Sequence, residues 1–211
     1  CHVRTEQGPT VTAQDVIVAT HLPILDQGLY FAKTFPQRSY LIGARIDPAI
    51  APAGMYIGTG EKYRSLRTTP TDDGGTLLLI GGEGHKVGEA NDTEQRFERL
   101  AAYAHKHFNV ESVDYYWSTQ DFVSFDGLPY IGPLTPLNQH TYIATGFSLW
   151  GMTNSTLSAM MLSDRILGRD NPWASLYDST RPTPFVSPAS LKNNVDVGVR
   201  WFGDRIKGLF D

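Results

Sequence analysis

The residues with the clearest chemical potential are Gly-Phe-Ser-Leu-Trp-Gly-Met-Thr at positions 146–153. The apolar run 142–145 before them predicts a buried strand, and the pattern over 154–167 predicts a helix. Glycines let a backbone turn tightly and approach a ligand, and a helix N-terminus presents unpaired N–H groups with the positive end of its dipole. This strand–loop–helix therefore predicts a site for a phosphate, or for a ring oxygen that gains negative charge on reduction.

Two other interpretations of this segment differ in weight. Gly146-Phe-Ser148 is similar to the start of a hydrolase nucleophile elbow, but that motif requires glycine two residues after the serine. Trp150 stands at that position, so the sequence disfavours a hydrolase. A plain strand–turn–helix corner with glycine at the turn stays open on these eight residues alone.

Further candidates for catalysis lie at predicted strands. The run 81–86, Gly-Gly-Glu-Gly-His-Lys, ends an apolar strand. It is either a flexible turn or a segment that brings His85 or Lys86 to the strand end that faces the ligand. Arg64 and Arg67 are three residues apart in another predicted strand. They therefore lie on opposite faces, and at most one of them can serve one site.

The composition narrows the class of protein. The chain has 211 residues, of which 41% are hydrophobic and 19% are charged, as in a globular domain. Its net charge of −4 argues against a nucleic-acid partner. The single cysteine excludes an internal disulfide and a multi-cysteine metal site, and we predict no metal site. No apolar run is long enough for a membrane span, and we expect a cytoplasmic protein.

The hydrophobic patterns predict an α+β fold, a mostly antiparallel sheet with helices. Residues 1–22 predict a two-stranded hairpin in which Val16–Val18 is the buried strand, and the apolar runs Tyr40–Ile42 and Leu77–Ile80 predict burial on both faces. Asp92 is the expected N-cap of a helix, with Gln95 completing a capping box. Further strands are predicted at 37–46, 54–59, 63–68, 76–82 and 113–118, and the helix at 92–108 with an apolar face of Phe97, Leu100, Ala101, Ala104 and Phe108.

A second motif, Asp-Gly-Leu-Pro-Tyr-Ile-Gly at 126–132, changes the interpretation of the loop. Together with Ile-Ala-Thr-Gly-Phe at 143–147 and Gly-Met-Thr at 151–153, it resembles the closing flavin-binding segment of the D-amino-acid-oxidase-like FAD-dependent oxidoreductases, which include glycine and sarcosine oxidases. Val-Ile-Val-Ala-Thr at 16–20 is similar to the strand where their FAD domain leads into the substrate domain, with His21 where glycine is usual. The resemblance implies FAD contacts at Ala19, Thr20, Gly127, Leu128, Gly132, Gly146, Phe147, Trp150, Gly151, Met152 and Thr153.

The family opens with Gly-x-Gly-x-x-Gly, which binds the FAD pyrophosphate, and this sequence has no such hexamer. The nearest stretches, from Gly58 and Gly82, carry Tyr63 and Val87 in place of the third glycine. We therefore expect the C-terminal part of a longer flavoprotein, which alone holds no FAD tightly and is inactive. The implied order is a remnant of the FAD domain (1–22), a substrate-domain-like sheet and helix (23–120), a return segment of the FAD domain (121–185) and a C-terminal helix or linker (186–211).

The resemblance implies that the whole protein transfers a hydride to flavin from a C–N bond of an amine or amino-acid-like substrate. The candidate catalytic residues are Arg64, Arg67, His85 and Trp150, the last of which would shield the flavin ring or narrow the substrate channel. A non-catalytic binding or interaction module is the alternative.

The run 81–86 also resembles a bacterial subgroup in which a Rieske iron–sulfur domain follows the flavoprotein. Residues 186–211 would then be a linker to that domain. The other interpretations of this segment are an amphipathic helix packed on its own domain and a helix on a membrane surface.

Overall fold

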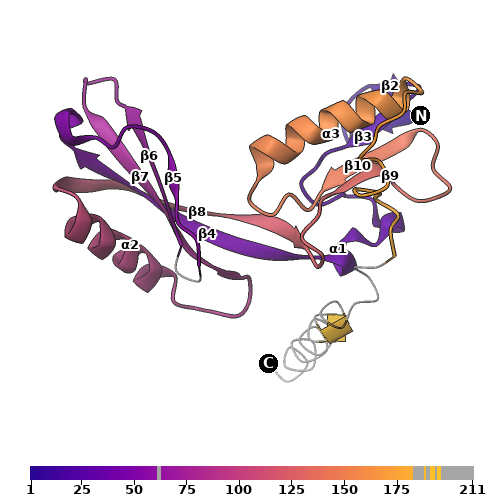
Figure 1. Ribbon diagram of the computed structural model, residues 1–211. Coiled ribbons are helices and arrows are strands. Elements are labelled where there is room, and N and C mark those ends of the chain that lie inside the picture. Colours follow the sequence, from indigo (N-terminus) through magenta and orange to yellow (C-terminus); the bar gives the residue numbers. More distant parts are fainter. Residues whose placement is uncertain (61–62, 183–187, 189–190, 193, 196–211) are drawn as a thin grey trace. The chain divides into compact units, whose positions relative to one another are not determined.

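The computed structural model describes residues 1–60, 63–182, 188, 191–192 and 194–195 (Figure 1). The chain divides into two compact units. The first contains Cys1–Phe35 and the chain from Asp121 onward, and the second is Pro36–Gln120. The helix or linker predicted at 186–211 lies almost entirely outside the described residues. Among those described, no helix has the length and apolar character needed to cross a membrane.

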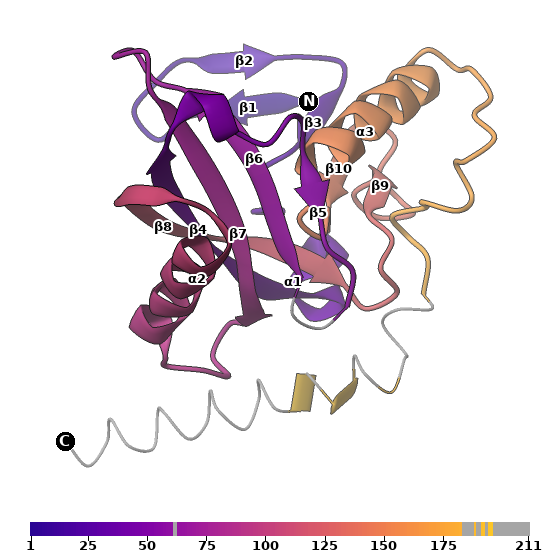
Figure 2. The same cartoon turned by 60° about the vertical axis from the view of Figure 1, so that its left-hand side comes forward.

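The second unit is a five-stranded sheet with a helix on one face (Figure 2). The strand order is β5-β6-β7-β4-β8, and the β5–β6, β6–β7 and β7–β4 pairs are antiparallel. This confirms the α+β class with a mainly antiparallel sheet. The elements are β4 (Thr34–Ile46), η2 (Pro48–Ile50), β5 (Tyr56–Ile57), β6 (Arg64–Pro70), β7 (Thr76–Lys86), α2 (Thr93–His107) and β8 (Val110–Ser124).

The core of this unit lies between the sheet and α2. Ile42 and Ile80 from the strands are fully buried together with Leu100 and Ala104 from the helix, as the helical periodicity predicts. The prediction that 40–42 and 77–80 are buried on both faces is wrong. Leu41 and Leu79 are only partly buried, because successive strand residues point to opposite faces and α2 packs on one of them.

Two further details of the second unit differ from the sequence prediction. Asp92 precedes α2, but its carboxylate makes no capping bond and binds Arg96 at 2.7 Å and Arg99 at 3.0 Å. The run 81–86 is no flexible turn, since β7 continues to Lys86 and stays paired with β4, with a shift of register between Arg38 and Tyr40. Positive φ angles at Gly82 and Glu83 give an irregular strand that keeps its partner.

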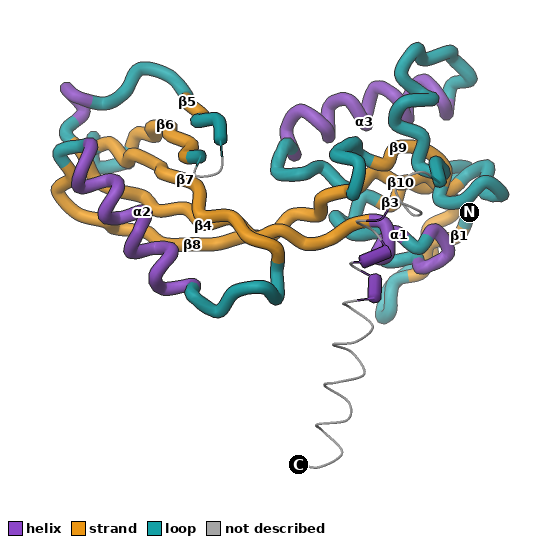
Figure 3. The backbone as a smooth tube through the Cα atoms, turned by 60° about the horizontal axis from the view of Figure 1, so that its bottom comes forward, coloured by secondary structure: helices purple, strands orange, loops and turns teal. Residues whose placement is uncertain are grey.

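The first unit is built on a three-stranded sheet of order β3-β10-β9 (Figure 3). The strand β3 (Val16–Val18) is parallel to β10 (Thr141–Thr145), and β9 (Tyr130–Pro133) is antiparallel to β10. The helix α3 (Gly151–Ile166) packs on one face of this sheet. Smaller elements are the hairpin of β1 (His2–Arg4) and β2 (Thr10–Thr12), η1 (Asp26–Gly28) and α1 (Tyr30–Lys33).

The predicted hairpin over 1–22 is only partly right. Residues 2–12 form it alone, and Val16–Val18 instead joins the sheet beside β10. At this sheet edge Val18 is buried while Ile17 is 47% exposed. Val16 of β3 pairs with Thr141 of β10, far away in the sequence, so local pattern could not identify this partner.

Candidate functional site

The segment 146–150 joins β10 to α3, as the sequence predicts. Three of its residues have positive φ: Gly146 (76°), Ser148 (54°) and Leu149 (69°). Glycine adopts this conformation freely, but a non-glycine residue there costs of order 1–2 kcal/mol. Two consecutive left-handed residues therefore indicate a loop that its surroundings hold in place.

The end of β8 supplies that hold. The N–H of Ser148 donates to the carbonyl of Phe122 at 3.1 Å, and the N–H of Leu149 donates to Asp121 Oδ2 at 2.6 Å. The side-chain amide of Asn154 donates to the carbonyl of Phe147 at 3.0 Å. These bonds fix the loop before any ligand binds.

Beyond the loop, the first turn of α3 is open. Trp150 precedes the helix without a side-chain capping bond. Gly151, Met152 and Thr153 are exposed, and no acceptor for their amides is found within the described part of the chain. An added Cβ at Gly151 would meet no heavy atom within 4 Å. Three donors at the positive end of a helix dipole, beside a residue without a side chain, fit the electron-rich pyrimidine edge of a flavin.

The motif 126–132 is organised by a residue that the sequence reasoning missed. Arg181 binds Asp126 through two contacts, of 2.7 and 2.9 Å, and donates to the carbonyls of Leu128 and Pro129 at 2.6 and 3.0 Å. Its guanidinium also lies 4.0 Å from the ring centroid of Tyr130. Burial opposes ionisation of Asp126, but Arg181 outweighs it and lowers the pKa of that carboxyl group. The sequence offered one signal for Arg181: Asp126 opens the motif 126–132, and a carboxylate in such a turn needs a cationic partner from elsewhere in the chain.

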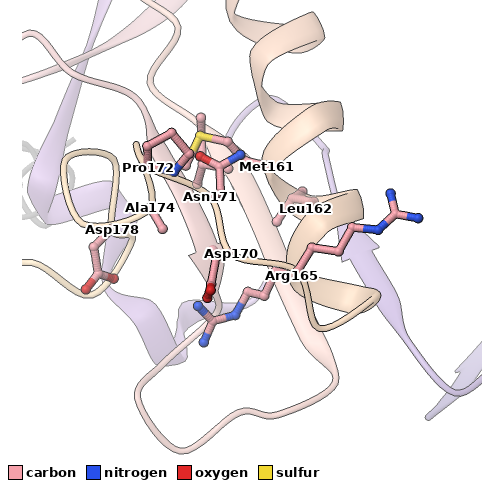
Figure 4. A pocket seen from close by; sticks show the side chains of 11 residues that line it. Met161, Leu162, Arg165, Asp170, Asn171, Pro172, Ala174 and Asp178 are labelled. Carbon is pink, nitrogen blue, oxygen red and sulfur yellow. The ribbon is translucent and has the colours of Figure 1, made fainter.

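The predicted cofactor residues do not all lie in one place. Gly127 and Leu128 lie in the turn that Arg181 holds. Gly132 lies in β9 and lines a cavity of about 600 Å³ beside the C-terminal half of α3 (Figure 4). That cavity also contacts Met161 and Asn171. Gly132 is thus assigned to a different surface from the amides at the start of α3.

The segment after β3 is linked to the loop through the side chain of His21, which binds Asp121. Ala19 and Thr20 are exposed, and His21 has φ of 67°, the conformation that favours the glycine usual at this position. The His21 Nε2 atom lies 2.7 Å from Asp121 Oδ1, on the carboxylate that also binds Leu149. The histidine at this position therefore adopts a conformation that glycine favours and adds a side-chain contact to Asp121.

In the second unit, Arg64 and His85 both lie on the α2 side of the sheet. Arg64 forms an ion pair with Glu83, which also accepts from Arg99 at 2.6 Å. Burial opposes ionisation of Glu83, but Arg99 and Arg64 outweigh it and lower the pKa of that carboxyl group. Arg64 is therefore engaged in an internal ion network.

His85 and Arg67 differ in surroundings. The imidazole of His85 stacks on Tyr40 with ring centroids 5.7 Å apart, and burial, together with Arg96, lowers its pKa. His85 lies at the end of β7, one residue before its last residue Lys86, as the sequence predicts, and its role toward the flavin stays a prediction. Arg67 is exposed, and no ion pair or hydrogen bond of its side chain is found among the described residues. Across all the residues that the structure describes, no three His, Cys, Asp or Glu side chains lie close enough together to hold a metal ion.

Comparisons with known proteins agree with this geometry. The family model described as FAD dependent oxidoreductase matches residues 2–165. A curated protein of Bacillus subtilis (strain 168), named as a Rieske 2Fe-2S iron-sulfur protein, YhfW, is 36% identical over 181 residues, which are 85% of this chain and 35% of that protein.

Three solved structures share the fold. Glycine oxidase from Geobacillus kaustophilus aligns with a TM-score of 0.62 and 20% identity over 83% of this chain and 47% of its own. Iminodiacetate oxidase from Chelativorans sp. BNC1 gives 0.57 and 16% over 83% and 48%, and L-proline dehydrogenase from P. horikoshii gives 0.53 and 24% over 72% and 40%. The chain thus spans about a third of the curated relative and less than half of each solved chain.

Proposed function

The chain belongs to the FAD-dependent oxidoreductase family, and we propose that it supplies the flavin-ring end and the substrate-domain part of an enzyme that oxidises a C–N bond. The observation that carries this proposal is the set of three amides at the start of α3 for which the described residues offer no acceptor, after a loop that hydrogen bonds to Phe122 and Asp121 hold in place. The proposed substrate is an amine or amino-acid-like molecule. The named activities of the glycine, iminodiacetate and proline enzymes of the same fold are the support for that class.

When bound, FAD supplies the hydride acceptor. The amides of Gly151, Met152 and Thr153 would donate to the pyrimidine edge, where negative charge develops on reduction. Donors that are oriented beforehand stabilise such charge strongly, because they need no reorganisation during the reaction. Trp150, which is 58% exposed beside them, would exclude water from the ring.

The candidate catalytic residues differ in whether their side chains already have a partner within the second unit. Arg64 is committed to Glu83, and His85 is packed on Tyr40. Arg67 is exposed on the sheet face opposite α2, where its guanidinium could bind a substrate carboxylate. We therefore rank Arg67 as the substrate-binding candidate of the second unit.

The rest of the proposal concerns the whole protein. The pyrophosphate-binding glycines would lie outside this sequence, so this part alone would hold no FAD tightly and would be inactive. The division at 1–22, 23–120, 121–185 and 186–211 stays a prediction, as does the cytoplasmic location. The Rieske name of the Bacillus subtilis relative supports a C-terminal Rieske domain as a further part of the whole protein.

The test uses the whole protein. We expect it to be purified yellow, with flavin absorption that bleaches when a reactive amine or amino acid is added without oxygen. Arg67→Gln should raise KM for carboxylate-bearing amines by about tenfold, since a hydrogen bond to a charged group is lost. The control Lys106→Gln, on the exposed surface of α2, should not. A whole protein without flavin, or one whose flavin no amine reduces, would contradict the proposal.

A further inference from the structure

The left-handed backbone at His21 is unusual for a side chain of this size. Its φ of 67° places it where glycine has no steric cost and histidine does. The imidazole offsets that cost through contacts with two residues of β8. Its Nε2 lies 2.7 Å from Asp121 Oδ1, and its ring meets the edge of Phe122 with centroids 5.0 Å apart. An ionised carboxylate only accepts, so Nε2 carries the hydrogen of this bond.

Asp121 connects that ring to the loop before α3. Asp121 Oδ1 accepts from His21 and also from the N–H of Phe122 at 2.7 Å, while Oδ2 accepts the N–H of Leu149 at 2.6 Å. Leu149 is itself left-handed and is the second residue before the helix begins. The backbone of His21 adds a second link, since its carbonyl accepts the hydroxyl of Thr145 at 2.5 Å, at the end of β10.

We propose that His21 is a positioning residue: through Asp121 it fixes the Leu149 amide and so aims the first turn of α3 at the flavin. The inference rests on the proposed function for its ligand. Without the ring, Asp121 Oδ1 would keep only the N–H of its chain neighbour Phe122, so the carboxylate would be freer to turn away from Leu149. His21 thus acts on the geometry of the loop, through the orientation of the Asp121 carboxylate.

The chain contains a matched control. His140 Nδ1 lies 2.9 Å from Asp15 Oδ1, with side-chain exposures of 52% and 19% against 50% and 15% for His21 and Asp121. The pair belongs to the same unit. Among the described residues, Asp15 accepts no hydrogen bond from an amide of the loop 146–150. Replacing His140 therefore removes an equally exposed histidine–aspartate pair without changing a contact of the loop.

The experiment compares His21→Gly with His140→Gly. Glycine suits φ of 67°, so His21→Gly should not lower the melting temperature. Hydrogen exchange of the Leu149 amide, measured without cofactor, should become about tenfold faster in His21→Gly and stay unchanged in His140→Gly. In the whole protein, FAD should bind about tenfold more weakly to His21→Gly, with a changed visible spectrum of the bound flavin.

The two readouts separate the claims. Unchanged exchange at Leu149 in His21→Gly would overturn the positioning role whether or not FAD binds. Faster exchange with an unchanged flavin spectrum and affinity would overturn the role toward the cofactor. A wild-type whole protein that binds no FAD would instead overturn the proposed function, while the exchange result would still decide how the loop is held.

Discussion

Replacing Gly151 by valine should remove cofactor function and leave the fold intact. Gly151 is the first residue of α3, its φ is not positive, and an added Cβ meets no heavy atom within 4 Å. Glycine and valine differ by only a few tenths of a kcal/mol in helix propensity, with valine the better. The free energy of unfolding should therefore change by less than about 0.5 kcal/mol.

Gly151→Val should instead weaken flavin binding and slow turnover. The added methyl groups occupy the space through which the Gly151 and Met152 amides would reach the pyrimidine edge. A displacement of about 1 Å in such a site costs on the order of 100-fold in rate. Urea unfolding measures the stability, and flavin fluorescence and turnover of the whole protein measure the function.

Two comparisons sharpen this test. Ala159→Val places the same side chain at an exposed position of the same helix and should leave FAD binding and turnover near wild type. Gly146→Val should differ again, because φ of 76° makes any side chain cost about 1–2 kcal/mol in the fold itself. Equal FAD affinity and turnover in Gly151→Val and Ala159→Val would refute the reasoning that this turn contacts the flavin.

Three further outcomes follow from contacts elsewhere. Arg181→Gln should lower the free energy of unfolding by about 2–3 kcal/mol in urea titrations, because Asp126 loses a largely buried partner, whereas the exposed Arg165→Gln should cost less than about 0.5 kcal/mol. The free energy of unfolding should fall as the pH drops below 6.5, the ordinary pKa of histidine. Burial and Arg96 lower the pKa of His85 in the folded chain, so the unfolded chain takes up the proton first. His85→Phe should flatten this fall, and an unchanged slope in that variant would contradict the prediction. A second fall should begin near pH 4.5, where Glu83 with its lowered pKa is still ionised in the folded chain; Glu83→Gln should lower stability at pH 7 and reduce this second fall in the same titration.

Local pattern predicted the elements of this protein well where their partners are near in sequence. The apolar face of α2 is visible as spacings of three and four, and the antiparallel strands β4, β6 and β7 follow one another along the chain. Strand β7 was predicted too short, since positive φ at Glu83 lets an irregular strand continue through a glycine-rich run that resembles a turn.

The candidate site was only half visible in the sequence. The loop and helix start at 146–153 could be predicted, because glycine spacing and a helix start are local signals. The contacts that hold the loop could not. Asp121 lies 100 residues from His21, and Arg181 lies 55 residues from Asp126, so both pairs need the folded chain to become visible.

The central claim is that the amides of Gly151, Met152 and Thr153 bind the flavin. Hydrogen exchange of these three amides in the whole protein, with and without FAD, tests it most directly. The account predicts that all three exchange rapidly without FAD and become protected when it binds, while amides in the middle of α3 keep their rates. Bound FAD with these three amides still exchanging at their unbound rates would contradict it.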